Sequence, residues 1–302
     1  MYSLDDFRKG LRNPALVYSE LCQPLVHANT VYNRRLRGRS GIRVMGRDWD
    51  NLVILDGCRY DTFERLNTID GELTAVVSGG SSSDEFVRHN FRGDTFYDTV
   101  YVSANPYVVR EGVAGNFYDD LELWQTDWDE DLRTVRPETV ADAALEAHER
   151  HPHKRLIVHF MQPHFPFIGE FGRTIDQRGI LEDDSDSINV WEQLRHGRLD
   201  RPTVRRAYEE NLELVLPHVE RLVEGLNGTS AVTADHGNGF GRLGVHGHPT
   251  GVFLRCLVEV PWLRVPGESP RRIETADARL EESAASTTGI EGRLADLGYL
   301  DG

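Results

Sequence analysis

One segment of the sequence gathers the side chains that bind metal ions just after an apolar run. Residues 229–251, TSAVTADHGNGFGRLGVHGHPTG, contain Asp235, His236, His246 and His248 among six glycines. Backbone geometry explains glycines, but it does not explain a carboxylate and three imidazoles beside them. Carboxylate oxygens and imidazole nitrogens are ligands for zinc and manganese. A divalent cation held here would polarise an ester oxygen and lower the pKa of a coordinated hydroxyl.

The same residues also have structural interpretations. Asp235 could simply bond the backbone of a turn at the end of a strand. Asn238 could contact a substrate or only favour a left-handed turn before Gly239. His246 and His248 lie in a glycine-rich loop, and the sequence does not rank them, although we expect at least one to be functional.

Further polar residues close other apolar runs in the same way. Asp56 closes the run at 50–57, three serines (Ser81, Ser82 and Ser83) follow the run at 74–80, and His164 closes the run at 154–164. In an open α/β sheet, ligands bind just beyond the carboxyl ends of the strands. We therefore expect these groups to meet at one end of a sheet.

The pattern of apolar runs and amphipathic segments predicts the elements that must position these groups. We expect helices at 137–151, at 203–226 with an interruption near Pro217, and at 275–300 with a break at 287–289. Residues 111–136 are expected to be an irregular surface excursion and 165–200 a loop-rich region, both able to fold over the site. The expected strands lie at 50–57, 74–80, 99–108, 154–164 and 229–237, with one or two more within 252–265.

Strands that alternate with helices predict an α/β fold with a mostly parallel central sheet covered by helices on both faces. The runs at 50–57, 74–80 and 99–108 are expected to be buried parallel strands, because they are short, apolar and closed by polar turns.

Ser83 is the predicted nucleophile, because it is the last serine before a helix expected to start near Asp84. The positive end of the helix dipole would favour an anionic transition state there. Ser82 and Glu85 have the spacing of a capping box, with Ser82 as N-cap. Ser81 and Ser82 stay open as alternatives for the nucleophile.

Composition limits the partners and the compartment. The chain has 302 residues, of which 39% are hydrophobic, and a formal net charge of −15. That charge disfavours nucleic acid and anionic lipid as partners. The sequence has no run of 18 apolar residues and no secretory signal at its start, so we expect a cytoplasmic protein without a membrane span. Three widely spaced cysteines argue against a disulfide framework or a thiolate metal site.

The basic residues are almost all arginine, because only Lys9 and Lys154 are lysines. An acidic chain with so little lysine indicates a halophilic protein, for which we expect a haloarchaeal source. A GC-rich genome is the alternative, since it also favours arginine codons.

Four motifs resemble the sulfatase-like branch of the alkaline phosphatase superfamily. They are LDGCRYD at 55–61, HFMQPHFPF at 159–167, VTADHGNGF at 232–240 and RLADLGYL at 293–300. The resemblance covers the chain from about residue 50 to its end. It implies a catalytic domain over residues 49–302, preceded by an N-terminal extension over residues 1–48.

The resemblance also implies a role for each candidate residue. Metal binding falls to Asp56, Ser83, Asp235 and His236, with Ser83 also the nucleophile. His164, with His246 or His248, would grip the oxyanion or a second metal. The full set is Ser83, His164 and His248 for catalysis, His164, His246 and Asn238 for substrate binding, and Asp56, Ser83, Asp235 and His236 for the metal.

Two departures from the family pattern shape the predicted chemistry. No cysteine or serine lies in the C-x-P-x-R or S-x-P-x-R pattern of type I sulfatases, so a plain serine hydroxyl favours phosphate esters or diesters over sulfate esters. Leu55 replaces the first acid of the sulfatase Asp-Asp pair, which favours zinc or manganese over calcium. The segment 159–170 lacks the aspartate that dinuclear relatives use, so one metal ion is expected, with two as the less favoured alternative.

The resulting prediction is a metal-dependent phosphoric ester hydrolase or transferase. Its substrate would be a small-molecule, glycan or lipid-head-group phosphoester. The alternatives are a sulfatase, a two-metal phosphodiesterase, or a non-catalytic protein that binds phosphate or a sugar phosphate on the same scaffold. The natural substrate and the oligomeric state stay open.

Overall fold

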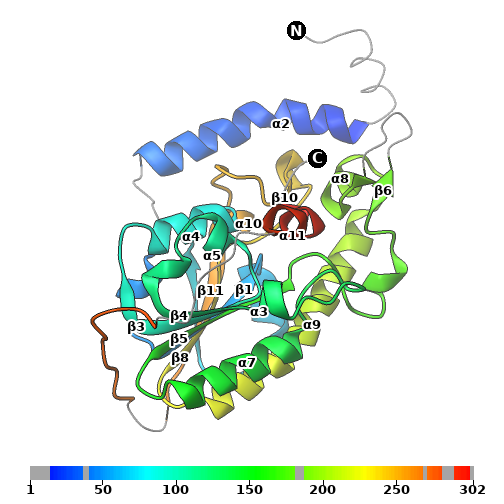
Figure 1. Ribbon diagram of the computed structural model, residues 1–302. Coiled ribbons are helices and arrows are strands. Elements are labelled where there is room, and N and C mark those ends of the chain that lie inside the picture. Colours follow the sequence, from blue (N-terminus) through cyan, green and yellow to red (C-terminus); the bar gives the residue numbers. More distant parts are fainter. Residues whose placement is uncertain (1–13, 37–40, 181–186, 268–270, 281–288, 300–302) are drawn as a thin grey trace.

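A single central sheet with helices on both faces forms the body of the protein (Figure 1). The structure is a computed structural model that describes residues 14–36, 41–180, 187–267, 271–280 and 289–299. Seven strands form the sheet in the order β2-β11-β8-β1-β5-β3-β4. Their bounds are β1 Asn51–Asp56, β2 Glu72–Val77, β3 Phe96–Ser103, β4 Phe117–Glu122, β5 Arg155–Pro163, β8 Ser230–Ala234 and β11 Glu259–Val265.

The sheet is mostly parallel, because β11 is antiparallel to both of its neighbours and the other six strands share one direction. The three central strands β8, β1 and β5 are buried almost throughout. Leu52 of β1 pairs with Ile157 of β5 on one side and with Ala231 of β8 on the other. Strands covered on both faces read as continuous apolar runs, which is why the sequence located them.

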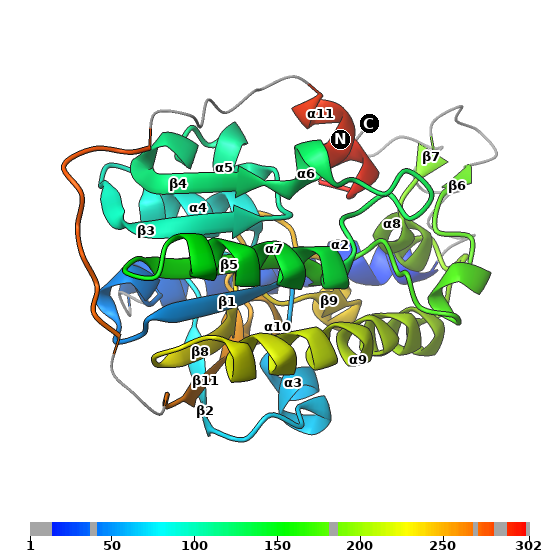
Figure 2. The ribbon, with the colours of Figure 1, turned by 60° about the horizontal axis from the view of Figure 1, so that its bottom comes forward.

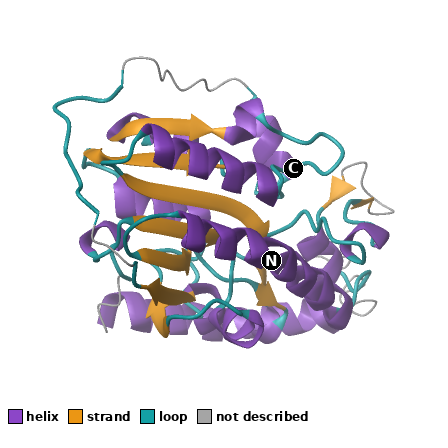
Figure 3. Ribbon diagram, turned by 90° about the horizontal axis from the view of Figure 1, so that it is seen from below, coloured by secondary structure: helices purple, strands orange, loops and turns teal. Residues whose placement is uncertain are grey.

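Helices α7 and α9 pack on one face of the sheet, and α4 lies on the other (Figures 2 and 3). The predicted fold class is therefore confirmed.

The α-helices are α2 Pro14–Val31, α3 Tyr60–Leu66, α4 Ser83–Phe91, α5 Tyr107–Arg110, α6 Leu123–Thr126, α7 Pro137–Arg150, α8 Val190–Arg195, α9 Arg201–Gly225, α10 Arg255–Val258 and α11 Ile290–Asp296. Two short hairpins pair β6 Gly179–Ile180 with β7 Ser187–Ile188, and β9 Gly239–Phe240 with β10 His246–Gly247. Short turns of other helix types are η1 Tyr32–Leu36, η2 Val44–Gly46, η3 Ala114–Asn116, η4 Gly172–Thr174 and η5 Arg242–Gly244.

Two predictions about the edges of the sheet were wrong. The strand expected at 74–80 is not buried: β2 is an edge strand, paired only with the antiparallel β11, and much of it is exposed. The segment 111–136 is not merely a surface excursion, because its residues Phe117–Glu122 form β4 at the opposite edge, parallel to β3. Edge strands carry polar or charged residues, so a pattern of apolar runs misjudges them.

Two helix predictions also need correction. Helix α9 is continuous through Pro217, which lies at an exposed position. Proline removes one backbone hydrogen bond, and at the surface water can take the place of the missing N–H. At the C-terminus, only Ile290–Asp296 is helical among the described residues of the expected helix at 275–300, and residues 275–280 are irregular. The rest of that prediction, at 281–288, lies outside the described residues.

Helix α2 lies across the end of the molecule that also carries α8, β10 and α11 (Figure 1). Its buried Val26 packs with Val245, Phe253 and Leu257. No helix within the described part of the chain is both long enough and apolar enough to cross a membrane. The division into an N-terminal extension and a catalytic domain stays a prediction.

Asn211 of α9 fastens the segment that follows β5. Its amide nitrogen donates to the carbonyls of His164 and Pro166, each at 3.0 Å, and its amide oxygen accepts from the backbone N–H of Ile168 at 2.8 Å. Asn211 is fully buried, so water cannot replace these three bonds.

We expect Asn211→Ala to lower the free energy of unfolding by about 2–4 kcal/mol, because it leaves three buried polar groups without partners. Denaturant unfolding of both proteins measures the difference. Leu214→Ala is the matched control, because Leu214 lies on the same helix and is 40% exposed. A loss of unfolding free energy in Asn211→Ala no larger than that in Leu214→Ala would contradict the role assigned to the three Asn211 hydrogen bonds.

Candidate active site and metal centre

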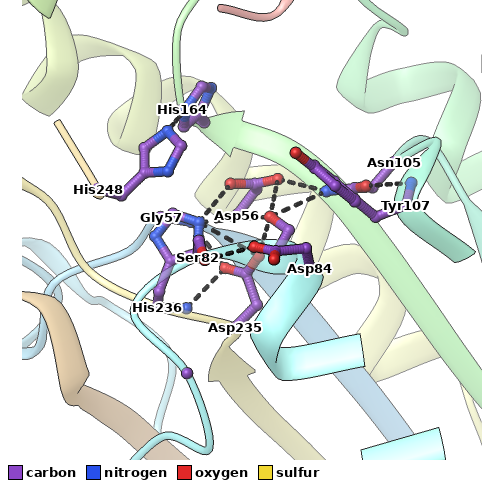
Figure 4. A network of polar contacts seen from close by, with 12 residues as sticks. Asp56, Gly57, Ser82, Asp84, Asn105, Tyr107, His164, Asp235, His236 and His248 are labelled. Carbon is purple, nitrogen blue, oxygen red and sulfur yellow. Dashed lines mark hydrogen bonds and ion pairs between the residues drawn. The ribbon is translucent and has the colours of Figure 1, made fainter. Parts of the chain in front are cut away.

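The polar groups predicted to meet do meet, at the carboxyl ends of three adjacent parallel strands. Asp56 is the last residue of β1, Asp235 directly follows β8, and His164 directly follows β5. Because β8, β1 and β5 are neighbours with the same direction, these side chains converge at one edge of the sheet. Figure 4 shows Asp56 and Asp235 close together, with His164 and His248 on one side of them.

Ser83 joins this group from the first turn of α4. Its hydroxyl lies 2.6 Å from Asp235 Oδ2, 3.5 Å from Asp56 Oδ2 and 3.3 Å from His236 Nε2. Ser83 is fully buried, and it is the first residue of a helix of nine residues. The structure thus brings together Asp56, Ser83, Asp235 and His236, the four predicted metal ligands.

The predicted capping box at this helix is wrong. Ser82 is the N-cap residue, but its hydroxyl donates to Asp84 Oδ1 at 2.5 Å and does not cap the helix. Glu85 accepts instead from the backbone N–H and the hydroxyl of Ser81, both at 2.9 Å. The Ser81 and Ser82 hydroxyls are therefore occupied by bonds to Glu85, to Asp84 and to residues 249–250. The Ser83 hydroxyl faces the two buried aspartates.

Hydrogen bonding orients the ring of His236 so that Nε2 points toward both carboxylates. Its Nδ1 lies 2.8 Å from the carbonyl of Gly237, which can only accept, so Nδ1 carries a proton. Nε2 lies 3.6 Å from Asp56 Oδ1 and 3.5 Å from Asp235 Oδ2. A histidine whose second nitrogen is fixed by a backbone carbonyl is the usual form of a metal ligand.

The separations between these donor atoms fit a tetrahedral cation. Ligands about 2.0–2.2 Å from a tetrahedral ion lie roughly 3.3–3.6 Å from one another. His236 Nε2 lies 3.3–3.6 Å from Ser83 Oγ, Asp56 Oδ1 and Asp235 Oδ2, which matches this range. Ser83 Oγ and Asp235 Oδ2 are closer, at 2.6 Å, because they share a hydrogen bond. Asp56 Oδ1 is buried without a hydrogen-bond partner, which a cation would remedy. The residues therefore fit a divalent metal ion.

The two aspartates titrate in opposite directions. Burial raises the pKa of Asp56 well above its ordinary value, and the charge of Asp235 raises it further, against hydrogen bonds from Tyr299, Asn105 and Ser83. Burial alone would also raise the pKa of Asp235, but the neighbouring His236 and His159 and the bond from Ser83 lower it below its ordinary value. The two carboxylates have oxygen atoms within 4.8 Å of each other. Ionising both buried groups therefore costs free energy unless a positive charge lies between them.

His164 and His248 form a second pair beside the aspartates. Their Nε2 atoms are 2.8 Å apart, and His164 Nδ1 donates to the carbonyl of Phe165 at 2.5 Å. Because His164 Nδ1 carries its proton, His248 Nε2 must donate to the lone pair of His164 Nε2. Burial lowers the pKa of His164 to about 3, and burial with its two histidine neighbours lowers that of His248 well below its usual value. Both imidazoles are neutral at pH 7.

The two remaining predicted residues lie farther from the nucleophile. His246 lines a cavity next to the site, and no hydrogen bond or ion pair within the described part of the chain joins it to Ser83 or either aspartate. Asn238 is buried, and its amide nitrogen donates to the carbonyl of Gly57 at 3.0 Å, directly after Asp56. Their predicted role in binding substrate stays a prediction, and Asn238 has a structural contact in this fold.

Sequence reasoning missed three residues of the site. Asn105 donates to Asp56 Oδ2 at 2.7 Å, and it follows the end of β3, the signal used for the other residues. His159 of β5 lies within 4.8 Å of both aspartates in a group that could hold a metal. Its Nε2 has no partner and is 3.9 Å from Asp235 Oδ2. The third missed residue, Tyr299, comes from beyond the sheet.

Tyr299, three residues after α11, covers Ser83. Its hydroxyl donates to Asp56 Oδ2 at 2.5 Å and lies 3.1 Å from Ser83 Oγ. Its ring stacks on His164, with centroids 4.9 Å apart and planes 9° apart. The motif RLADLGYL carried only a family resemblance in the sequence, and nothing in its spacing locates Tyr299 over Ser83.

A cavity of about 320 Å³ lies on the outer side of Tyr299. The predicted loop-rich region 165–200 contributes Asn189, Trp191 and Arg195 to its wall, as expected. The segment 111–136 was also expected to cover the site, but none of its residues lines this cavity. It supports the site indirectly, through the ion pair of Glu130 with Arg293 of α11.

Comparison with known proteins identifies the fold. No protein-family profile and no curated protein sequence matches the chain. The soluble domain of lipooligosaccharide phosphoethanolamine transferase A from Neisseria meningitidis superposes with a TM-score of 0.50 at 11% identity, over 72% of this chain and 76% of that chain. The full-length integral membrane enzyme also gives 0.50, at 12% identity, over 72% of this chain and 47% of that one. A 2-O GAG sulfatase gives a lower TM-score of 0.48 at 11% identity, over 83% and 71% of the two chains. At identities this low the likeness shows the fold alone.

The neutral state of His164 predicts that the metal-free protein loses stability in acid. Its folded pKa of about 3 lies below the value of about 6.5 expected in the unfolded chain. Between these two values the unfolded state binds more protons, so stability falls as pH falls. At pH 5 this one histidine should have removed about 2 kcal/mol relative to pH 7.

Unfolding of chelator-treated protein between pH 7 and pH 4.5 measures this slope. His164→Asn should give a shallower slope, and His153→Asn, at an exposed histidine, should leave the slope of the wild type. Equal slopes in His164→Asn and the wild type would contradict a buried neutral His164.

Proposed function

We propose that this protein is a metal-dependent hydrolase or transferase of phosphate esters or phosphodiesters, with Ser83 as its nucleophile. The observation that carries the proposal is the position of Ser83 Oγ, 2.6 Å from Asp235 Oδ2 and at the start of α4. Two structural neighbours named phosphoethanolamine transferases support a phosphoester substrate, such as a small molecule, a glycan or a lipid head group. The serine lies outside the sulfatase nucleophile pattern, since Ser83 is followed by Asp-Glu-Phe-Val.

One divalent cation, zinc or manganese, would be held by Asp56, Asp235, His236 and Ser83. When bound, such an ion neutralises the buried carboxylates and makes the serine hydroxyl more acidic. His159 is an alternative nitrogen ligand for this ion, because its Nε2 lies 3.9 Å from Asp235 Oδ2. The pair of His164 and His248 is the place for a second ion if one binds.

Ser83 carries out the bond-forming step. Its hydroxyl proton passes to Asp235 Oδ2, Oγ bonds to phosphorus, and the ester P–O bond on the far side breaks. The departing oxygen takes a proton from water in the adjoining cavity. A second water or an acceptor hydroxyl then gives its proton to the hydroxide left in the cavity and attacks phosphorus. The bond from phosphorus to Ser83 Oγ breaks, and Oγ takes back the proton that Asp235 held. The first-turn N–H groups of α4 favour the negative charge that develops at phosphorus.

His164 and His248 would contact the nonbridging oxygens of the phosphoryl group. They are neutral in the empty protein, but an anion in contact with the pair favours its protonated form, because an opposite charge raises the pKa of a histidine. The phosphoryl group must displace the Tyr299 hydroxyl, which lies beside Ser83 on the cavity side. Substrate choice then falls to the cavity wall, including Trp191 and Arg195.

Ser83→Ala should lower kcat by about a thousandfold or more on a phosphodiester or phosphomonoester, because it removes the attacking atom. Ser82→Ala is the matched control and should stay within a few-fold of the wild type, since the Ser82 hydroxyl bonds Asp84 instead. Rates on p-nitrophenyl phosphate, bis-p-nitrophenyl phosphate and p-nitrophenyl sulfate, each with zinc or manganese, compare the ester classes. Dominant sulfate hydrolysis would favour the sulfatase alternative, and full activity in Ser83→Ala would remove the nucleophile from the proposal.

Metal binding can be tested without any activity. Elemental analysis should find about one zinc or manganese ion per chain, and Asp235→Asn should weaken zinc binding in calorimetric titration by about a hundredfold or more. Asp84→Asn is the matched control, because Asp84 bonds Ser82 and Arg88 and lies outside the ligand set. Two ions per chain would contradict the single-ion site. No binding at all would favour a non-catalytic phosphate-binding protein.

A further inference from the structure

Helix α2 and the turn η1 that follows it expose an apolar stripe. Only six large hydrophobic side chains are exposed in the described part of the chain, and five of them belong to these two elements. Leu21 is 72% exposed and Leu25 64%, more than any other. The five residues are Val17, Tyr18, Leu21, Leu25 and Tyr32.

The stripe is one face of the helix. At about 100° per residue, Val17, Leu21 and Leu25 lie on one side of α2, and the exposed Pro24 and Ala28 fall between them. The opposite side carries Cys22 and Val26, which are buried. The helix is thus anchored through a modest buried face and presents a more apolar face outward, the reverse of the usual arrangement.

Basic residues follow the stripe directly. Between residues 21 and 47 the chain has six arginines and no acidic residue, in a protein whose net charge is −15. Arg35 is exposed at the end of the stripe, in η1, and Arg34 beside it is paired with Glu85 at 2.9 Å. Charges are screened over about 8–10 Å at physiological salt, so a surface in contact with the stripe responds mainly to the charges near it. Glu20 is the single acidic residue of α2, and it lies 3.9 Å from Arg195.

We propose that α2 and η1 form a docking surface for an anionic lipid membrane, lying flat in the head-group region. An exposed apolar stripe followed by arginines has the two features of an interfacial helix. The stripe is a single protruding ridge, so a protein partner would need a matching groove, whereas a lipid layer needs no complementary shape. The overall charge disfavours anionic lipid, but the charge next to the stripe decides contact at short range.

The buried side of α2 packs against the wall of the cavity. Gly244 of η5 lies so close to α2 that a Cβ there would come within 2.4 Å of Ser19 Cα. His246, two residues later, lines the cavity beside Tyr299, and Arg195 of the same wall lies 3.9 Å from Glu20 of α2. Ser19 is buried on the side of α2 away from the stripe, so this packing leaves the stripe itself uncovered. The proposal does not depend on the reaction assigned to the site.

Co-sedimentation of the full chain with vesicles tests the surface. Vesicles of phosphatidylcholine with 30% phosphatidylglycerol, on the order of a physiological anionic content, should bind the protein more tightly than phosphatidylcholine alone. The double variant Leu21→Ser, Leu25→Ser should lower the partition coefficient by about tenfold or more. Arg35→Gln should weaken binding to the anionic vesicles and leave binding to the neutral vesicles unchanged.

Leu214→Ser is the matched control, because Leu214 is the one exposed large hydrophobic residue of the described chain outside α2 and η1. It should bind vesicles like the wild type, and thermal unfolding should be the same for all three serine-substituted positions. No vesicle binding by the wild type would overturn the proposal, as would equal losses in Leu214→Ser and the double variant. Light scattering that finds a dimer dissociated by the double variant, without vesicle binding, would assign the stripe to a second copy of the chain.

Discussion

Two carboxylates buried side by side are the constraint on which the rest of the structure depends. Asp56 and Asp235 are both fully buried at the ends of neighbouring parallel strands, and the strand pairing of β1 with β8 fixes their separation. Like charges at such a distance repel strongly in a medium of low polarity. The surrounding groups, Ser83, Asn105, Tyr299 and the Gly57 backbone N–H, all direct protons at these two side chains.

The nitrogen of His236 belongs to the same donor set. His236 binds a backbone carbonyl through Nδ1 and turns Nε2 toward both carboxylates. Imidazole nitrogen and carboxylate oxygen are ligand atoms that zinc and manganese take in proteins. This arrangement of donor atoms underlies the proposal of a metal centre.

The site also ties distant parts of the chain together. Tyr299, from the end of α11, bonds Asp56 of the first strand, and α11 is held in turn by Arg293 with Glu130 and by Arg178 with Asp296. The C-terminal segment, the edge of the sheet and the loop-rich region therefore meet over one serine. Tyr299 contacts Ser83 and also lines the cavity, so a substrate in the cavity reaches Ser83 only if Tyr299 is displaced.

The sequence by itself determined the buried parallel strands and the residues that end them. Continuous apolar runs mark strands covered on both faces, so Asp56, His164 and Asp235 could be placed at one end of the sheet from their position after those runs. The predicted edges failed for the same reason: β2 and β4 are partly exposed, and a strand that is not fully buried leaves no such run.

Only the tertiary structure decided which groups complete the site. Ser83 was separated from Ser81 and Ser82 by the direction of its hydroxyl, which depends on how the turn enters α4 and not on residue type. His248 was separated from His246 by its contact with His164 across 84 residues of sequence. Tyr299 and Asn105 reach Asp56 through packing between elements far apart in the chain, and periodicity within a segment carries no information about such contacts.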